Sequence, residues 1–179
     1  IINSGALGQF PPALEELHGA SVQAAIISLY SLVGIFGKIF IGWINDKFGV
    51  VVSATYGCIM FGLAFVFMLL GQNTNMLYIM AVVFGFGNAI GTVIPPLVTS
   101  EVFGMEKYPE AYGMVNSATQ VGLSLGSLLV ASMYDLNGSY TLAWMLLLVL
   151  TAVTLFSWVG SCIVAKRYMA SDVELKQAQ

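Results

Sequence analysis

One lysine stands inside an otherwise apolar stretch and could carry the chemistry of a buried charge. Lys38 lies within residues 22–44, a run long enough to cross a bilayer. A charge inside a membrane helix is costly, so Lys38 needs a partner inside the protein. We expect an ion pair with Asp46 or Glu101. The alternatives are an ammonium group that extends to the lipid headgroups and a direct contact with a solute.

Polar side chains also form stripes on two later apolar runs. In residues 109–134, helical spacing places Asn116, Gln120, Ser124 and Ser127 on one face. An amide in hydrocarbon is costly unless it meets protein or water. Lining a water-filled cavity would satisfy these groups, and so would hydrogen bonds to an adjacent helix. The candidate cavity residues of the two runs are Asn88, Thr92, Asn116, Gln120 and Ser124.

The residue pattern that catalysis needs is not recognisable in this sequence. We expect His18, the one histidine, to be solvated in a loop. Cys58 and Cys162 fall inside apolar runs and are interpreted as buried apolar residues. We find no nucleophile and base pair, no cluster of metal ligands and no glycine-rich phosphate loop. The sequence therefore predicts no catalytic residue, no metal and no cofactor, and it disfavours an enzyme.

The composition places these candidate residues in a membrane protein. The chain is 58% hydrophobic and 8% charged, whereas a soluble domain carries roughly 25% charged residues. Such a chain cannot cover a water-facing surface, so the lipid bilayer is its expected surrounding. Six Lys and Arg in 179 residues also exclude the basic patch that nucleic-acid binding requires.

The elements that position these residues are predicted to be membrane-crossing helices. Each apolar run has about 21–26 residues, enough to span a core of about 30 Å. Residues 1–14 are interpreted as the outer end of a truncated helix, broken at Pro11 and Pro12. Residues 22–165 form a bundle of five helices, and residues 166–179 form a tail. The runs cover residues 22–44, 50–71, 76–100, 109–134 and 141–165.

The connectors alternate in charge and predict the orientation of the chain. Lysine or arginine occurs in the connectors 45–49 and 101–108 and in the tail. The other connectors, residues 15–21, 72–75 and 135–140, hold neither. By the positive-inside rule, the basic side and the C-terminus are cytoplasmic. The charged residues inside the runs, Lys38 among them, are expected near the inner ends rather than at mid-membrane.

Differences in polarity between the runs predict which helices lie inside the bundle. Residues 50–71 and 141–165 are apolar all round, so we expect both at the periphery, facing lipid. Small residues predict close helix packing at Gly87 and Gly91, and again at Gly122 and Gly126. The pair Pro95-Pro96 favours a bend in the third run.

The turn after the first complete run resembles the loop motif of the major facilitator superfamily, G-x-x-x-D-[RK]-x-G-[RK]-[RK]. Gly42, Asp46, Lys47 and Gly49 match four motif positions. The two closing basic positions hold valine here. That loss resembles the degenerate copy of the motif in the second half of such carriers.

The resemblance implies an all-α membrane protein, the C-terminal six-helix half of a twelve-helix carrier with its first helix truncated. It implies a secondary active transporter that moves a small organic solute by alternating access, with the N-terminal half and a coupling ion, either a proton or a counter-substrate, as partners. Asp46 would lock the cytoplasmic side at the N-terminus of the helix 109–134, braced by Lys38 and Glu101. The alternative is a membrane sensor of the same fold that binds a solute without moving it.

Two short stretches narrow the resemblance. The sequence from Glu101 to Gly104, and the pair Tyr112-Gly113, resemble the oxalate/formate and monocarboxylate branch. This implies a monocarboxylate or another organic anion as solute, and the plasma membrane as location. Carriers of that branch usually hold a cation at mid-membrane in this half, where this sequence offers Gln120 and Asn116. Either the solute is neutral, or the absent half meets its charge.

Overall fold

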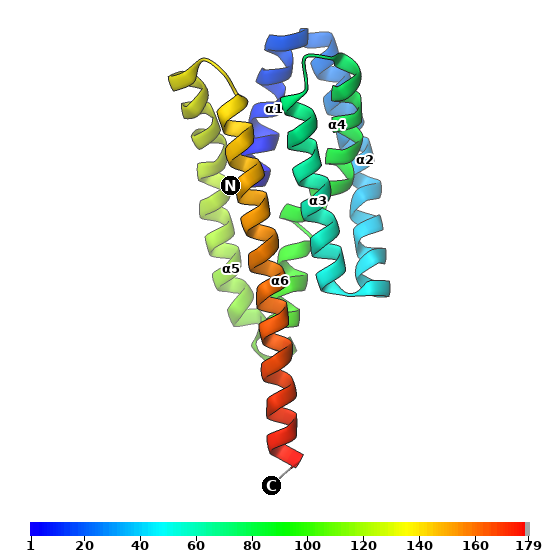
Figure 1. Ribbon diagram of the computed structural model, residues 1–179, viewed down its shortest axis with the longest axis vertical. Coiled ribbons are helices and arrows are strands. Elements are labelled where there is room, and N and C mark those ends of the chain that lie inside the picture. The colour runs from blue at the N-terminus through cyan, green and yellow to red at the C-terminus, as the bar shows by residue number, and fades with distance from the viewer. Residues whose placement is uncertain (178–179) are drawn as a thin grey trace.

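The computed structural model describes residues 1–177, which form a bundle of helices without any β-strand (Figure 1). The predicted all-α membrane helix bundle is confirmed. Four stretches are long and apolar enough to cross a membrane: Ala20–Phe48, Val50–Leu69, Thr74–Asn137 and Thr141–Tyr168. The elements are α1 (Ile2–His18), α2 (Ala20–Phe48), α3 (Val50–Leu69), α4 (Thr74–Gly87), the 3-10 helix η1 (Asn88–Gly91), α5 (Ile94–Asn137) and α6 (Thr141–Gln177).

The long stretch Thr74–Asn137 contains two of the predicted runs, and the chain reverses between them at Gly104 (Figure 1). Gly104 has φ 71° inside an otherwise helical segment. Only glycine adopts this backbone angle at no steric cost, so the reversal needs that residue. The predicted connector 101–108 is therefore helical except around one glycine. The predicted tail also differs, because α6 continues through Gln177 rather than ending at residue 165.

Prolines do not break the helices where the sequence predicted. α1 continues through Pro11 and Pro12 to His18, and the Pro11 carbonyl accepts a hydrogen bond of 3.1 Å from the Gln23 side chain. This bond joins α1 to α2, whereas the donors missing at the two prolines are those that would bond the carbonyls of residues 7 and 8. Pro95 and Pro96 lie in the first turn of α5, where N–H groups have no helical partner in any case. The interruption lies upstream, at η1.

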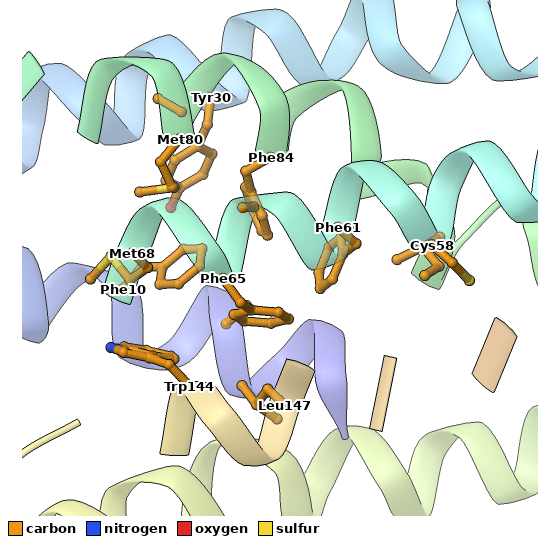
Figure 2. Packing of buried hydrophobic residues seen from close by; sticks show 14 of the residues in the cluster. Phe10, Tyr30, Cys58, Phe61, Phe65, Met68, Met80, Phe84, Trp144 and Leu147 are labelled. Atoms are coloured by element: carbon orange, nitrogen blue, oxygen red, sulfur yellow. The ribbon is translucent and has the colours of Figure 1, made fainter. Parts of the chain in front are cut away.

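The interior is organised around five rings that we call the aromatic core: Phe10, Phe61, Phe65, Phe84 and Trp144 (Figure 2). Their exposed fractions are at most 3%. The ring centroids of Phe10 and Phe84 lie 4.9 Å apart, and those of Phe61 and Phe84 lie 5.0 Å apart, both within the range of favourable aromatic contact. The core joins α1, α3, α4 and α6.

The expectation that residues 50–71 are peripheral is wrong for one side of α3. This helix contacts α2, α4, α5 and α6, and half of its apolar window is buried. Its other side remains exposed, at Val52 and Ile59 among others. A helix that packs an apolar core on one side and meets lipid on the other is apolar all round. α6 agrees better with the expectation, since 22% of its window is buried.

Glycines let the helices approach one another closely. A Cβ atom on Gly37 of α2 would lie 2.5 Å from the carbonyl oxygen of Gly85 in α4. The predicted pair Gly87 and Gly91 is divided between two neighbours, because Gly87 packs on α3 and Gly91 on Asn3 of α1. The predicted packing face of Gly122 and Gly126 is confirmed.

The partner of that glycine face is α1. Three residue pairs, joined by side-chain hydrogen bonds, connect α1 to α5 with the same sequence offset of 118 residues. They run from Ser4 to Gly122, from Gln9 to Ser127 and from Tyr134 to Glu16. A constant offset means that α1 and this part of α5 run parallel and in register. α1 also packs against α2, so α2 and α5 flank it.

Candidate functional site

Polar side chains that nothing covers lie on the two helices flanking α1. α2 buries one face, which includes Ile26, Gly34 and Ile41, and leaves Lys38 exposed on another. We call five of the uncovered polar residues of α2 and α5 the open face. They are Ser31, Lys38, Asn116, Gln120 and Ser124.

The predicted ion pair between Lys38 and Glu101 is wrong. The Glu101 carboxylate pairs with the Lys166 ammonium group of α6, at 3.2 Å. Within residues 1–168, no carboxylate lies within ion-pair distance of Lys38. α2 extends ten residues beyond Lys38, to Phe48, which corresponds to about 15 Å of helix. The last turn of this segment carries Asp46 and Lys47, and the position of Lys38 near the inner end of the span stays a prediction.

Only part of the polar stripe on α5 forms hydrogen bonds to an adjacent helix. Ser127 faces α1, where the Gln9 side chain donates to its hydroxyl at 3.1 Å. The Ser124 hydroxyl donates to the carbonyl of Gln120 in its own helix, at 3.0 Å. Asn116 and Gln120 make no side-chain hydrogen bond in the described part of the chain. Their carboxamide groups are therefore available to another molecule or to another part of the protein.

The remaining two cavity candidates, Asn88 and Thr92, lie where η1 interrupts the helix between α4 and α5. Asn88 begins η1, and its amide nitrogen lies 3.7 Å from where a Cβ of Gly34 would be. Thr92 follows η1 and is exposed. The interruption places both at the junction of α2, α4 and α5, where backbone groups leave regular helical bonding. Interrupted helices bind solutes in several families of transporter.

Asn3 is a polar residue that sequence reasoning missed. It lines a cavity of about 480 Å³ together with Gly91, Thr119 and Trp158. Its side-chain oxygen is buried and has no hydrogen-bond partner in residues 1–168. Nothing in the local sequence distinguishes it, because residues 1–14 show no polar stripe. Asn3 stands out only in the structure, because it packs against Gly91 of η1, which lies almost ninety residues further along the chain.

The motif turn is exposed at the end of α2. The Lys47 ammonium group lies 5.1 Å from the ring centroid of Trp43 and 5.5 Å from that of Phe48. Gly49 has φ 85°, which favours glycine at this motif position. Asp46 is exposed, and in the described residues it makes no hydrogen bond to the N-terminus of a neighbouring helix. The predicted lock is thus not formed in this structure.

Among the connectors, lysine and arginine occur at one end of the bundle only. This basic end contains Lys47, Lys107, Lys166 and Arg167 together with acidic residues such as Asp46, Glu101 and Glu106, and the acidic end contains Glu15, Glu16 and Asp135. The connectors that hold lysine or arginine thus lie at one end of the bundle and the remaining connectors at the other end, as the alternation along the chain predicts (Figure 1).

His18 at the acidic end is not the solvated loop residue that was predicted. It ends α1, and its Nε2 lies 2.7 Å from the Gly71 carbonyl oxygen. Its Nδ1 lies 3.4 Å from the Thr74 hydroxyl. The ring therefore ties α1 to the α3–α4 turn. The two cysteines are free and buried, as predicted.

Comparison with known proteins identifies the family that the motif turn resembles. The family model of the Major Facilitator Superfamily matches residues 1–174. Human monocarboxylate transporter 12 is 27% identical over 135 residues, which cover 72% of this chain and 26% of that protein. Monocarboxylate transporter 9 of Pongo abelii is 29% identical over 152 residues, which cover 77% of this chain and 29% of that protein. No solved structure matches at the same significance.

Proposed function

Because the chain belongs to the major facilitator superfamily, we propose that it is part of a secondary transporter for a small organic anion. The relatives that it matches are named as monocarboxylate transporters, and a monocarboxylate is the first candidate solute. The observation that carries the proposal is Lys38, a cation inside a membrane span that has no counter-ion in the described chain.

The energetics of Lys38 favour an anionic solute. A charged side chain inside a membrane is costly and is usually retained where it faces a partner or a water-filled path. Glu101 is occupied by Lys166, and Asp46 lies at the end of α2, eight residues further on. A carboxylate on the solute would supply the missing negative charge. Lys38 would then bind the solute and be hydrated when the site is empty.

The other residues of the open face complete such a site. The side chains of Asn116 and Gln120 carry N–H donors that suit carboxylate or hydroxyl oxygens. Thr92 and Asn88 add polar groups at the interrupted helix. We place the solute between these groups and Lys38. Residues of α2, η1 and α5 would thus converge on one path near the middle of the membrane, as in other secondary transporters.

We further propose that a second bundle of the same protein covers the open face, since the matched relatives are several times longer than this chain. Alternating access would then open the path to each side in turn, coupled to a proton or a counter-substrate. The motif turn of Gly42, Asp46, Lys47 and Gly49 would lock the basic end, which we place in the cytoplasm together with the C-terminus. The plasma membrane is the proposed location.

The test is uptake of a labelled monocarboxylate by the full-length protein in proteoliposomes. Lys38→Gln removes the charge and should raise the solute concentration for half-maximal uptake about tenfold or more. Lys38→Arg retains the charge and should retain most of the uptake. Lys107→Gln is the matched control, because that lysine is exposed in the connector 101–108, outside both the open face and the motif turn.

Equal uptake by wild type and Lys38→Gln would remove Lys38 from the site. An absence of monocarboxylate uptake by the wild type, with uptake of a neutral solute instead, would overturn the anion assignment.

A further inference from the structure

A second pocket, of about 270 Å³, lies at the acidic end of the bundle. Its walls come from the last turn of α1, the end of α3 and the connection between α5 and α6. The side chains that shape it are Glu16, Met68, Tyr134, Tyr140 and Trp144. No residue of the open face lines this pocket. Its ligand is therefore a separate question from the solute of the proposed path.

One wall of the pocket is a stack of three aromatic rings. Tyr134 stacks on Tyr140 with ring centroids 4.3 Å apart and an angle of 24° between the rings. Tyr140 stacks on Trp144 at 5.4 Å and 19°. Trp144 is 3% exposed and stacks in turn on Phe65 of the aromatic core, at 6.2 Å. The wall is thus anchored in the buried aromatic core.

A carboxylate is held at the rim of this wall. The Tyr134 hydroxyl donates to Glu16 Oε1 at 2.9 Å, which orients the carboxylate and leaves Oε2 for another donor. Glu16 forms no ion pair with any residue that the structure describes. The connectors at this end contain no lysine or arginine. A negative charge beside an aromatic wall therefore has no internal counter-ion.

The surrounding charges reinforce that negative potential. Glu15 and Asp135 lie at the same end of the bundle, and His18 is tied through both ring nitrogens to Gly71 and Thr74. Burial, the neighbouring Tyr134 and the carboxylates of Glu16 and Asp135 together raise the pKa of Tyr140. The Tyr140 hydroxyl remains protonated at neutral pH, donates to Gln9 Oε1 at 3.4 Å and can accept a further hydrogen bond.

We propose that this pocket binds a small organic cation, an ammonium group on a short alkyl chain, with Glu16 as its counter-ion. Ammonium groups bind well beside carboxylates and aromatic rings. Met68 and Trp144 supply an apolar floor for the alkyl part. An anion would meet the uncompensated charge of Glu16. A divalent metal ion would find a single carboxylate, because the other polar side chains of the lining, Gln72, Ser139 and Thr141, are neutral. The proposal does not rest on the transport function proposed above.

The test compares two probes that differ in charge and hardly in shape. Choline carries a quaternary ammonium group, and dimethylbutanol has a carbon atom in place of that nitrogen. Binding of each to the purified full-length protein in nanodiscs is measured by titration. Choline should bind saturably and at least about tenfold more tightly than dimethylbutanol, because a charged partner strengthens the contact with a carboxylate.

Variants of neighbouring residues locate the site. Glu16→Gln keeps an oxygen that accepts from Tyr134 and removes the charge, and it should weaken choline binding about tenfold or more. Tyr134→Phe keeps the ring and releases the carboxylate, with an expected loss of about two- to tenfold. Glu15→Gln is the matched control, one residue away and outside the pocket lining. It should weaken choline binding by less than about twofold, since the Glu15 carboxylate acts only through the screened potential outside the pocket. The unfolding temperature of each variant verifies its fold.

Three results would overturn the proposal. They are the absence of saturable choline binding to the wild type, equal binding of choline and dimethylbutanol, and an equal loss of binding in Glu15→Gln and Glu16→Gln. The second result would identify an apolar pocket without selectivity for charge.

Discussion

The aromatic core and the open face belong to one bundle but satisfy their side chains in opposite ways. Phe10, Phe61, Phe65 and Phe84 contact one another and are fully buried. Lys38, Asn116 and Gln120 are exposed and have no side-chain partner in residues 1–168. The core therefore satisfies its side chains within the bundle, whereas these polar groups of the open face do not.

The comparison also shows what exposure means in a membrane. An exposed leucine or phenylalanine is at no disadvantage in lipid, and α2 exposes several of them. An exposed amide or ammonium group in the same position is costly. Polar exposure is thus the informative signal in this chain, and it separates the open face from the lipid-facing surface of α3 and α6.

The largest effect that would sharpen this contrast is the loss of a core ring. Phe65→Ala should reduce the free energy of unfolding by about 3–5 kcal/mol, because it leaves a cavity between α1, α3 and α6. Ile59→Ala is the control on the same helix, since Ile59 is 50% exposed, and its effect should be much smaller. Thermal unfolding of the full-length protein in detergent measures both. Similar losses for the two variants would mean that α3 does not build the core.

A smaller effect is expected where two helix backbones touch. In Gly37→Ala the new methyl group would meet the Gly85 carbonyl oxygen, and overpacking of this kind costs about 1–3 kcal/mol. Gly42→Ala, five residues further along α2, meets no atom within 4 Å. That control should gain up to about 1 kcal/mol from helix propensity. If Gly37→Ala unfolds at the wild-type temperature, α2 and α4 are less closely packed than the structure shows.

The smallest effect concerns the motif turn, where the proposed lock is a contact between a carboxylate and a helix N-terminus. Asp46→Asn should leave stability unchanged, since Asp46 is exposed without a partner in the described chain. It should shift the ratio of inward-open to outward-open protein by about two- to fivefold, the effect of a charge at a helix end. Accessibility labelling from each side, with uptake rates, measures this. Wild-type populations and rates would remove the gating role.

Much of the fold follows from local sequence. Apolar runs of membrane length, the glycine after Lys47 and the face of Gly122 and Gly126 all appear in the structure where they were predicted. The reason is that hydrocarbon imposes its cost on each residue individually, so length and polarity decide which segments cross. Helical spacing likewise decides which side chains share a face, as for Asn116 and Gln120.

Which side chains pair with one another across helices was decided by the tertiary structure alone. Glu101 lies 63 residues from Lys38 and 65 from Lys166, and sequence distance cannot distinguish the two; only the position of α6 does. The sequence likewise does not indicate that Gln9 donates a hydrogen bond to Ser127, or that Gln23 donates one to the Pro11 carbonyl. Such contacts depend on distances between helices that are remote in sequence. Composition and periodicity describe one helix at a time and contain no such distance.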